Sequence, residues 1–143
     1  MTVKSILDSK GRDVVTIAPD ATLGDAARLL GSNRIGAVVV TYGDGRIAGI
    51  LSERDIVRTI GASGAEALLT TVDQAMTAKV RTCSEAGTIN EVMETMTRGR
   101  FRHLPVEKDG RLAGIISIGD VVKRRIEEVE HEAEQIREYI ATA

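Results

Sequence analysis

Residues 49–55 read Gly-Ile-Leu-Ser-Glu-Arg-Asp, and residues 114–120 read Gly-Ile-Ile-Ser-Ile-Gly-Asp. Both stretches share the pattern Gly-x-x-Ser-x-x-Asp, and each follows an Asp-Gly pair, at residues 44–45 and 109–110. Such a return indicates an internal duplication, and duplicated units commonly cannot bury their apolar face alone. We therefore expect two halves that pack on each other as one domain, with any site present in pairs.

The duplication extends outward from this pattern over most of the chain. Residues 15–21 (VTIAPDA) align with residues 80–86 (VRTCSEA), and a weaker echo links residues 2–7 with residues 71–76. The similarity ends near Lys123. The chain is therefore divided into repeat 1 (1–60), a linker (61–71), repeat 2 (72–125) and a C-terminal helix extension (126–143).

Each half predicts the order strand, helix, strand, strand, helix. In the first half, residues 14–17 form a β-branched run, and Thr22-x-x-Asp25 is a capping box that begins a helix. Residues 38–40 and 47–51 are apolar runs around an Asp-Gly turn, which favours the positive φ of tight hairpins. The second half repeats this order, with capping boxes at Thr88-x-x-Glu91 and Ser117-x-x-Asp120. The predicted fold class is α/β.

The segment after Lys123 carries a regular apolar stripe. It runs to Ala143 without Gly or Pro. Its apolar residues follow a 4-3-4-3-4 spacing: Val122, Ile126, Val129, Ala133, Ile136 and Ile140. This spacing predicts a long helix that meets another surface. Two interpretations stay open, a cap on the chain's own domain and a contact with a second copy, and the length of the stripe favours a homodimer.

The composition argues against several classes of protein. The net charge is −2 and aromatic residues make up 2% of the chain, so a basic field and stacking platforms for nucleic acid are both missing. Cys83 is the only cysteine, and no Cys or His spacing suits a metal. No signal peptide or run of about 20 apolar residues is present. We expect a cytoplasmic protein without a metal, a membrane contact or a nucleic-acid partner.

The repeated Gly-x-x-Ser-x-x-Asp has two interpretations. Ser52-x-x-Asp55 and Ser117-x-x-Asp120 are capping boxes, which begin helices in proteins of every function. Each Ser also follows an apolar strand directly, so the helix N-terminus presents free N–H groups where a phosphate commonly binds. The Asp can accept two hydrogen bonds from a ribose, and the Gly leaves room for a ligand beside the backbone. The second interpretation predicts a pair of nucleotide sites.

The doubled pattern, the order of elements and the stretch Arg102-His103-Leu104-Pro105-Val106 resemble a tandem pair of cystathionine β-synthase (CBS) domains, over about residues 1–125. The resemblance implies two pseudo-symmetric repeats packed sheet to sheet. It also implies a regulatory module that binds an adenine nucleotide in two clefts and passes a conformational change to an effector protein. AMP is the first candidate ligand, followed by ADP, ATP, NAD(H) and S-adenosylmethionine.

The resemblance also implies roles for individual residues. It places Asp55 and Asp120 at the ribose hydroxyls, with Ser52 and Ser117 near the ribose and phosphate. The adenine is expected against the first strand of the opposite copy. For the Asp120 cleft this is the region 10–16, with Lys10, Val14 and Val15, and for the Asp55 cleft it is the region 77–81, with Val80. Ile50 and Ile115, which precede the two Ser residues on their strands, complete the predicted ligand-binding set.

The two clefts are predicted to differ in affinity. Arg102 and His103 stand where the family often has phosphate-binding cations, and a charge-assisted contact from Arg is strong. The first copy has Gly36 and Ala37 at those positions, so a phosphate near Asp55 would need Arg54, Arg34 or another cation. We therefore expect the Asp120 cleft to bind nucleotide more tightly. Without the resemblance, Arg102 and His103 are a surface cation and a structural histidine.

Two other functions stay open. One is a structural dimerisation module with vestigial clefts. The other is a small nucleotide-processing enzyme, which would need a metal or a base with a nucleophile, and the sequence offers only His103 beside Arg102. We expect no catalytic residues.

Overall fold

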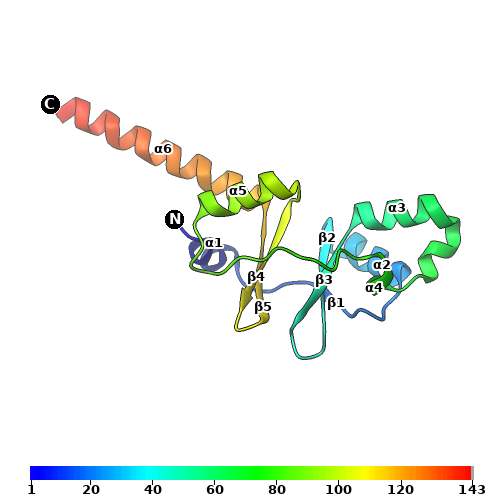
Figure 1. Ribbon diagram of the computed structural model, residues 1–143. Helices are drawn as coiled ribbons and strands as arrows, with labels where there is room; N and C mark the ends of the chain where they lie inside the picture. The colour runs from blue at the N-terminus through cyan, green and yellow to red at the C-terminus, as the bar shows by residue number, and fades with distance from the viewer. Residues whose placement is uncertain (143) are drawn as a thin grey trace.

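Residues 1–142, which the computed structural model describes, form two small sheets that face each other, with helices on the outer sides (Figure 1). The first sheet has the order β1-β2-β3, with β1 at Thr16–Ile17, β2 at Ala37–Thr41 and β3 at Ile47–Ser52. The second contains β4 at His103–Lys108 and β5 at Arg111–Ser117. β2 with β3, and β4 with β5, are antiparallel hairpins. Their turns hold Gly45 at φ 89° and Gly110 at φ 78°, the positive φ that the Asp-Gly pairs predict.

The helices begin where the capping boxes predict. They are α1 (Val3–Lys10), α2 (Leu23–Asn33), α3 (Glu53–Ser63), the 3-10 helix η1 (Gly64–Leu69), α4 (Val72–Ala75), α5 (Ile89–Gly99) and α6 (Ile118–Thr142). At Thr22, Ser52 and Thr88 the side-chain oxygen accepts a hydrogen bond from the backbone N–H three residues on, and the acidic residue there returns one. These bonds satisfy N–H groups that a helix start otherwise leaves unpaired. The α/β fold class is confirmed.

The strand expected near Val80 does not form. Only an isolated parallel bridge joins this region to β4, between Cys83 and Val106. Cys83 donates to the carbonyl of Pro105 at 3.0 Å, and its own carbonyl accepts from Glu107 at 2.9 Å. The next bond of a parallel ladder would need an N–H from Pro105 to reach Arg81, and proline has none. Proline in β4 therefore ends the pairing after one bridge.

The chain crosses from one half to the other after α1 and again after α4. Helix α1, at the start of the chain, therefore packs in the core of the second half, and α4, at the start of repeat 2, packs in the core of the first half. Val3 and Leu7 of α1 are fully buried in the core of the second half, with Leu104, Val106, Ile116 and their neighbours. Val72 of α4 is fully buried in the core of the first half, with Leu23, Val38, Val40, Leu51 and their neighbours. Packing halves and sequence halves therefore differ, because α1 and α4 are exchanged.

Gly49 and Gly114 make this exchange possible. A Cβ on Gly49 would lie 2.6 Å from the Thr77 carbonyl oxygen and 2.7 Å from the Met76 sulfur. A Cβ on Gly114 would lie 2.8 Å from a methyl carbon of Leu7. The room beside each glycine, which the sequence analysis reserved for a ligand, is therefore filled by the chain itself. That prediction is wrong because the crossing segment packs directly on the strand backbone.

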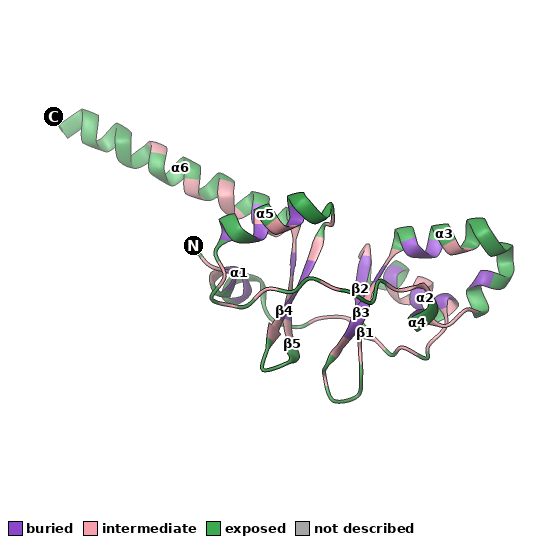
Figure 2. Ribbon diagram, in the orientation of Figure 1, coloured by how far each residue is buried: buried purple, intermediate pink, exposed green. Residues whose placement is uncertain are grey.

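Helix α6 is one continuous helix of 25 residues that projects beyond the sheets (Figure 1). It starts inside repeat 2 and runs without a break into the predicted extension. Val121 in its first turns is 1% exposed, but most of the helix beyond is exposed (Figure 2). Val122 and Ile136 of the apolar stripe are 46% and 60% exposed. The stripe therefore does not cap the chain's own domain. Within residues 1–142, no helix has the length and apolar character needed to cross a membrane.

Candidate functional site

A cavity of about 380 Å³ lies beside Asp55, and three segments of the chain meet there. The first is the junction of β3 and α3, the second is the crossing segment of residues 77–81, and the third is the turn that leads into β4. Its lining is Gly36, Ala37, Ile50, Ser52, Glu53, Arg54, Asp55, Arg58, Thr77, Lys79, Val80, Arg81, Gly99, Arg100, Phe101, Arg102 and His103. Ligand pockets in proteins commonly have volumes of roughly 300–1,000 Å³. The cavity has the size of a nucleotide site.

Asp55 lines this cavity and is 5% exposed. Its Oδ2 accepts hydrogen bonds from the N–H of Ser52 at 2.9 Å and from the Ser52 hydroxyl at 3.1 Å. Its Oδ1 accepts only from the Arg58 guanidinium, at 3.2 Å, and the Arg58 side chain is 73% exposed. The capping box therefore holds one oxygen firmly, while the other can accept from a ligand hydroxyl if Arg58 moves aside.

Six cationic side chains line the same cavity. They are Arg54, Arg58, Lys79, Arg81, Arg100 and Arg102. Within residues 1–142, only Arg58 of these six forms an ion pair. The lining carries two carboxylates, Glu53 and Asp55, so its net charge is +4, whereas the whole chain carries −2. Unpaired charges of one sign around a cavity concentrate the field and attract a ligand of the opposite sign. The cavity is therefore built for an anion.

His103 lines the Asp55 cavity and pairs with Ser117 across the β4–β5 hairpin. It is also near enough to Asp120 for the charge of that carboxylate to affect it. Burial lowers the pKa of His103, and the positive charges of Lys10 and Arg102 lower it further against the opposing effect of Asp120. The imidazole is therefore neutral at pH 7 and can both donate and accept a hydrogen bond.

The corner beside Asp120 is closed by a lysine. Lys10 Nζ donates to Asp120 Oδ2 at 2.7 Å and to the Ile115 carbonyl oxygen at 3.1 Å. The N–H of Ser117 donates to the same carboxylate at 2.9 Å. Burial alone would raise the pKa of Asp120, but the hydrogen bonds from Lys10 and Ser117 outweigh it and hold the pKa below its usual value. A pocket of about 60 Å³ is found beside Lys10 and Asp120, well below the roughly 300–1,000 Å³ of common ligand pockets.

Arg102 and His103 lie in the Asp55 cavity, which corrects their assignment to the Asp120 cleft. The sequence predicts these two residues in the cleft of the Asp of their own copy. The turn before β4 and the start of α3, which belong to different copies, instead line one cavity. The position of these residues therefore favours tighter nucleotide binding in the Asp55 cavity than at Asp120, the opposite of the predicted order of affinity.

The remaining predicted residues divide among the cavity, the closed corner and the core. Ser52, Arg54, Ile50 and Val80 join Asp55 in the cavity, and Ser117, Ile115 and Lys10 join Asp120 at the closed corner. Val14 and Val15 line neither space, and Val15 packs against the core of the first half. The backbone of Ile50 is bonded to Thr77 in both directions, at 3.0 and 2.9 Å, so only its side chain is available to a ligand. The adenine role implied for Val14 and Val15 is therefore not supported by their position.

Sequence reasoning missed Arg58 and Arg100 of the cavity, and it placed residues 77–81 beside Asp55 without naming Lys79 and Arg81 as cations for a phosphate. A signal for the latter two was present. The repeat alignment that matches Val15 with Val80 sets Lys79 and Arg81 against uncharged residues of the first copy. Comparing the copies at those positions would have shown that cations gather on the Asp55 side.

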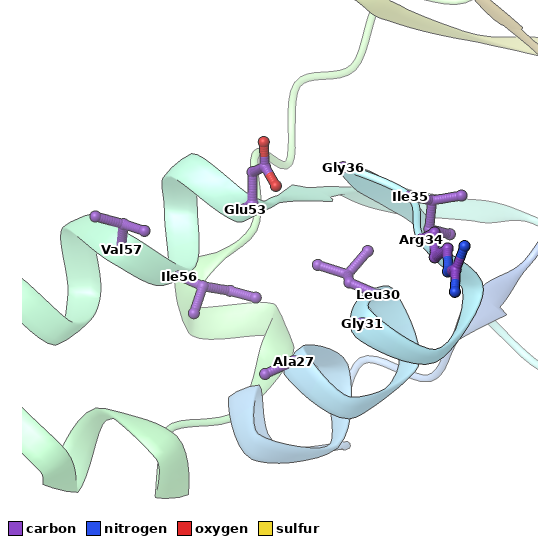
Figure 3. Close-up of a pocket in the computed structure, with 9 residues that line it drawn as sticks. All are labelled: Ala27, Leu30, Gly31, Arg34, Ile35, Gly36, Glu53, Ile56 and Val57. Carbon is purple, nitrogen blue, oxygen red and sulfur yellow. The ribbon is translucent and has the colours of Figure 1, made fainter.

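A second hollow, of about 510 Å³, lies between α2 and α3 (Figure 3). Its lining is mostly apolar, from Ala27, Leu30, Ile35, Ile56 and Val57, with Arg34 and Glu53 as the charged side chains. Arg34, one of the cations considered for the Asp55 cleft, lies here instead. The hollow therefore offers no cluster of cations that would hold a phosphate.

Neither a metal centre nor an activated thiol is found in the part of the chain that the structure describes. No three His, Cys, Asp or Glu side chains of residues 1–142 come together as metal ligands. Burial raises the pKa of the Cys83 thiol to about 11, so this thiol is protonated at neutral pH and is a poor nucleophile.

The family model of the CBS domain matches residues 3–62 and 72–127. The mitochondrial CBS domain-containing protein CBSX3 of Arabidopsis thaliana is 34% identical over 147 residues, which is 97% of this chain and 71% of that protein. That relative is mitochondrial by name, and the compartment of this chain stays a prediction.

Solved structures show the same fold. A CBS-domain-containing protein of Agrobacterium tumefaciens is 56% identical, with a TM-score of 0.83 over 87% of this chain and 92% of that one. A CBS domain pair crystallised with methylthioadenosine and S-adenosyl-L-methionine has a TM-score of 0.79 over 90% of this chain and 98% of that one. Its sequence identity is 22%, so this likeness concerns the fold alone.

Proposed function

This chain belongs to the CBS domain family, and on that basis we propose that it is a regulatory module that binds one adenine nucleotide in the Asp55 cavity. The observation that carries the proposal is a single cavity holding a buried carboxylate acceptor and six cations, five of them without an ion pair in residues 1–142. The carboxylate can accept hydrogen bonds from ribose hydroxyls, and the cations can bind phosphates. The adenine base rests on the family, one of whose members is crystallised with adenosine ligands.

The contacts of the ligand are proposed from the residues at each end of the cavity. Ribose hydroxyls donate to Asp55 Oδ1 in place of Arg58, while Ser52 keeps the other oxygen in position. Phosphate oxygens accept from Arg100 and Arg102, and charge-assisted bonds of this kind are about twice as strong as neutral ones. The base lies along the apolar side chain of Val80, which lines the same cavity.

The same arrangement suggests how binding is transmitted. Arg54 and Arg58 come from α3 in the first half, whereas Arg100 and Arg102 come from the turn before β4 in the second half. Without a ligand these cations repel one another across the cavity. A polyphosphate bound among them would draw the two halves together, and we propose that an effector protein senses this closure. We propose that the ligand is bound and released unchanged.

Calorimetric titration of the full chain tests the proposal. ATP, ADP, AMP, NADH and S-adenosylmethionine are compared with inorganic triphosphate at two salt concentrations. We expect one site per chain, an affinity that rises from AMP to ATP because the lining carries +4, and weaker binding at high salt. S-adenosylmethionine, which carries a positive sulfonium, should bind weakest. No binding by any of them at millimolar concentration would reject the sensor and favour the structural dimerisation module.

Replacing Lys10 tests why only one nucleotide is expected. Lys10→Ala removes the ammonium that pairs with Asp120 at 2.7 Å and the side chain that closes this corner. We expect the number of ATP molecules bound per chain to rise from one towards two, with the second weaker because that side has fewer cations. Lys4→Ala is the matched control, since Lys4 lies exposed on the same helix and pairs only with Asp8.

A pair of conservative variants checks the assignment of the first site. Asp55→Asn should weaken ATP binding by about tenfold, the effect of one charged hydrogen bond, while Asp120→Asn should leave it unchanged. Both replacements remove one capping-box carboxylate, so their effects on helix stability are matched. Equal losses, or two equal sites in the wild-type chain, would contradict the closed corner.

A further inference from the structure

One cation of the Asp55 cavity is already engaged by the chain itself. Arg58 donates to Asp55 Oδ1 at 3.2 Å, whereas the other five cations of the lining form no ion pair within residues 1–142. The capping box does not use Oδ1, because the N–H and the hydroxyl of Ser52 both donate to Oδ2. The Arg58 guanidinium therefore occupies the acceptor that a ribose hydroxyl would need.

The two side chains of this ion pair are held with different firmness. The Asp55 side chain is 6% exposed and is fixed by the capping box, whereas the Arg58 side chain is 73% exposed. The single hydrogen bond that joins them is at the long end of the range for an N–H donor. Exposed ion pairs contribute little to stability. Arg58 can therefore leave Asp55 at small cost, while the carboxylate stays in place.

Arg58 also lies on the face of α3 where an anion is expected. Arg54 and Arg58 are four residues apart, so they are neighbours on one face of the helix, and both line the cavity. The guanidinium carries five N–H donors in a geometry that suits phosphate oxygens. Arg58 therefore has two alternative partners, the buried carboxylate of Asp55 and a phosphate of a bound ligand.

The second copy holds its carboxylate in a different way. The residue equivalent to Arg58, 65 positions on, is Lys123, but Asp120 pairs with Lys10 instead. The Lys10 side chain is 34% exposed and donates a second bond to the Ile115 carbonyl oxygen at 3.1 Å. Two bonds from a partly buried lysine close that corner, whereas one long bond from an exposed arginine can be displaced by a ligand.

We propose that Arg58 makes the Asp55 cavity selective for phosphorylated ligands, because it covers the Asp55 acceptor until a phosphate draws it away. This inference rests on the proposed function, since it needs a ribose at Asp55. A neutral nucleoside such as adenosine must displace Arg58 and offers it no new partner. A nucleotide displaces the same contact but gives the guanidinium a charge-assisted bond to phosphate. The module therefore responds to phosphorylated ligands and discriminates against the free nucleoside.

Calorimetric titration of the full-length Arg58→Ala chain with adenosine and with ATP tests this selectivity. Adenosine should bind about two- to fivefold more tightly than it binds the wild type, because an exposed ion pair no longer competes for Asp55. ATP should bind about tenfold more weakly, because a bond to a charged phosphate is lost. The two affinities therefore change in opposite directions. The thermal midpoint should stay the same, since the Arg58 side chain is 73% exposed.

Arg54→Ala is the matched control. Arg54 lines the same cavity one turn earlier on α3 and forms no ion pair within residues 1–142. Its removal should weaken ATP binding but leave adenosine binding unchanged, because no carboxylate is released. A double-mutant cycle isolates the contact itself. In an Asp55→Asn background, Arg58→Ala should no longer strengthen the binding of adenosine.

The outcomes separate this inference from the proposed function. If ATP binds the wild type but Arg58→Ala gives no gain in adenosine affinity, the selectivity by Arg58 is overturned and the nucleotide site stands. A gain of the same size in Arg54→Ala, or in the Asp55→Asn background, would overturn it as well. A wild-type chain that binds neither ligand would reject both the inference and the proposed function.

Discussion

Replacing Leu7 with alanine should lower the free energy of unfolding by about 3 kcal/mol, within the range of roughly 2–5 kcal/mol for a buried Leu→Ala change. Leu7 lies ahead of the first strand in sequence, yet it is fully buried in the core of the second half and contacts the space above Gly114. An alanine at position 7 would leave a void beside Gly114, because the glycine has no side-chain atoms to fill it. Urea-induced unfolding followed by far-ultraviolet circular dichroism measures the loss.

Ser9→Ala on the same helix is the matched control. Ser9 is exposed and lies two residues further on, so its replacement should change stability by less than about 0.5 kcal/mol. If Leu7→Ala lost no more than this control, α1 would not belong to the core of the second half, and the exchange of helices would be refuted.

Replacing Arg102 with alanine should weaken ATP binding by roughly 10- to 150-fold, the equivalent of about 1.5–3 kcal/mol for a hydrogen bond to a charged group. Arg102 lines the Asp55 cavity, is exposed, and forms no ion pair within residues 1–142, so its guanidinium is free to meet a phosphate. Its removal also lowers the lining charge from +4 to +3. Calorimetric titration at fixed ionic strength measures the change.

Arg28→Ala is the control for the loss of one positive charge. Arg28 lies exposed on α2, pairs with Asp25, and is outside the cavity. Arg102→Lys should fall between the wild type and Arg102→Ala, because an ammonium cannot make the two parallel bonds of a guanidinium. Equal losses in Arg102→Ala and Arg28→Ala would show that the phosphates bind elsewhere.

The elements of this fold were predictable where their causes are local. A capping box joins residues three apart, as at Ser52 and Asp55, and an Asp-Gly turn needs only a positive φ at Gly45. The duplication was visible for the same reason, since each copy carries its own local signals. The absence of a strand near Arg81 was harder to predict, because it depends on Pro105, which lies in a distant segment of the chain.

The candidate site was predictable only in its residue types. Asp55 and Asp120 have the same pattern, yet Asp55 lines a cavity of about 380 Å³ and Asp120 is bonded to Lys10. The Lys10 contact that closes the Asp120 corner comes from a residue 110 positions away in the chain. The sequence therefore identified the pair of corners, whereas the position of Arg102 and His103 in the Asp55 cavity favours the opposite order of affinity.

The amino-acid sequence alone determined the two repeats, their helix starts and hairpins, and the apolar stripe of α6. Each of these features is recognised from the spacing of residues that lie close together in the chain. The fold in three dimensions decided the rest. In the folded chain, α1 packs beside Gly114 in the second half, and the segment after α4 packs beside Gly49 in the first half. Arg102 lines the same cavity as Asp55. These outcomes depend on which surfaces meet when two sheets pack face to face, and the balance of burial and charge at such contacts involves residues far apart in the chain.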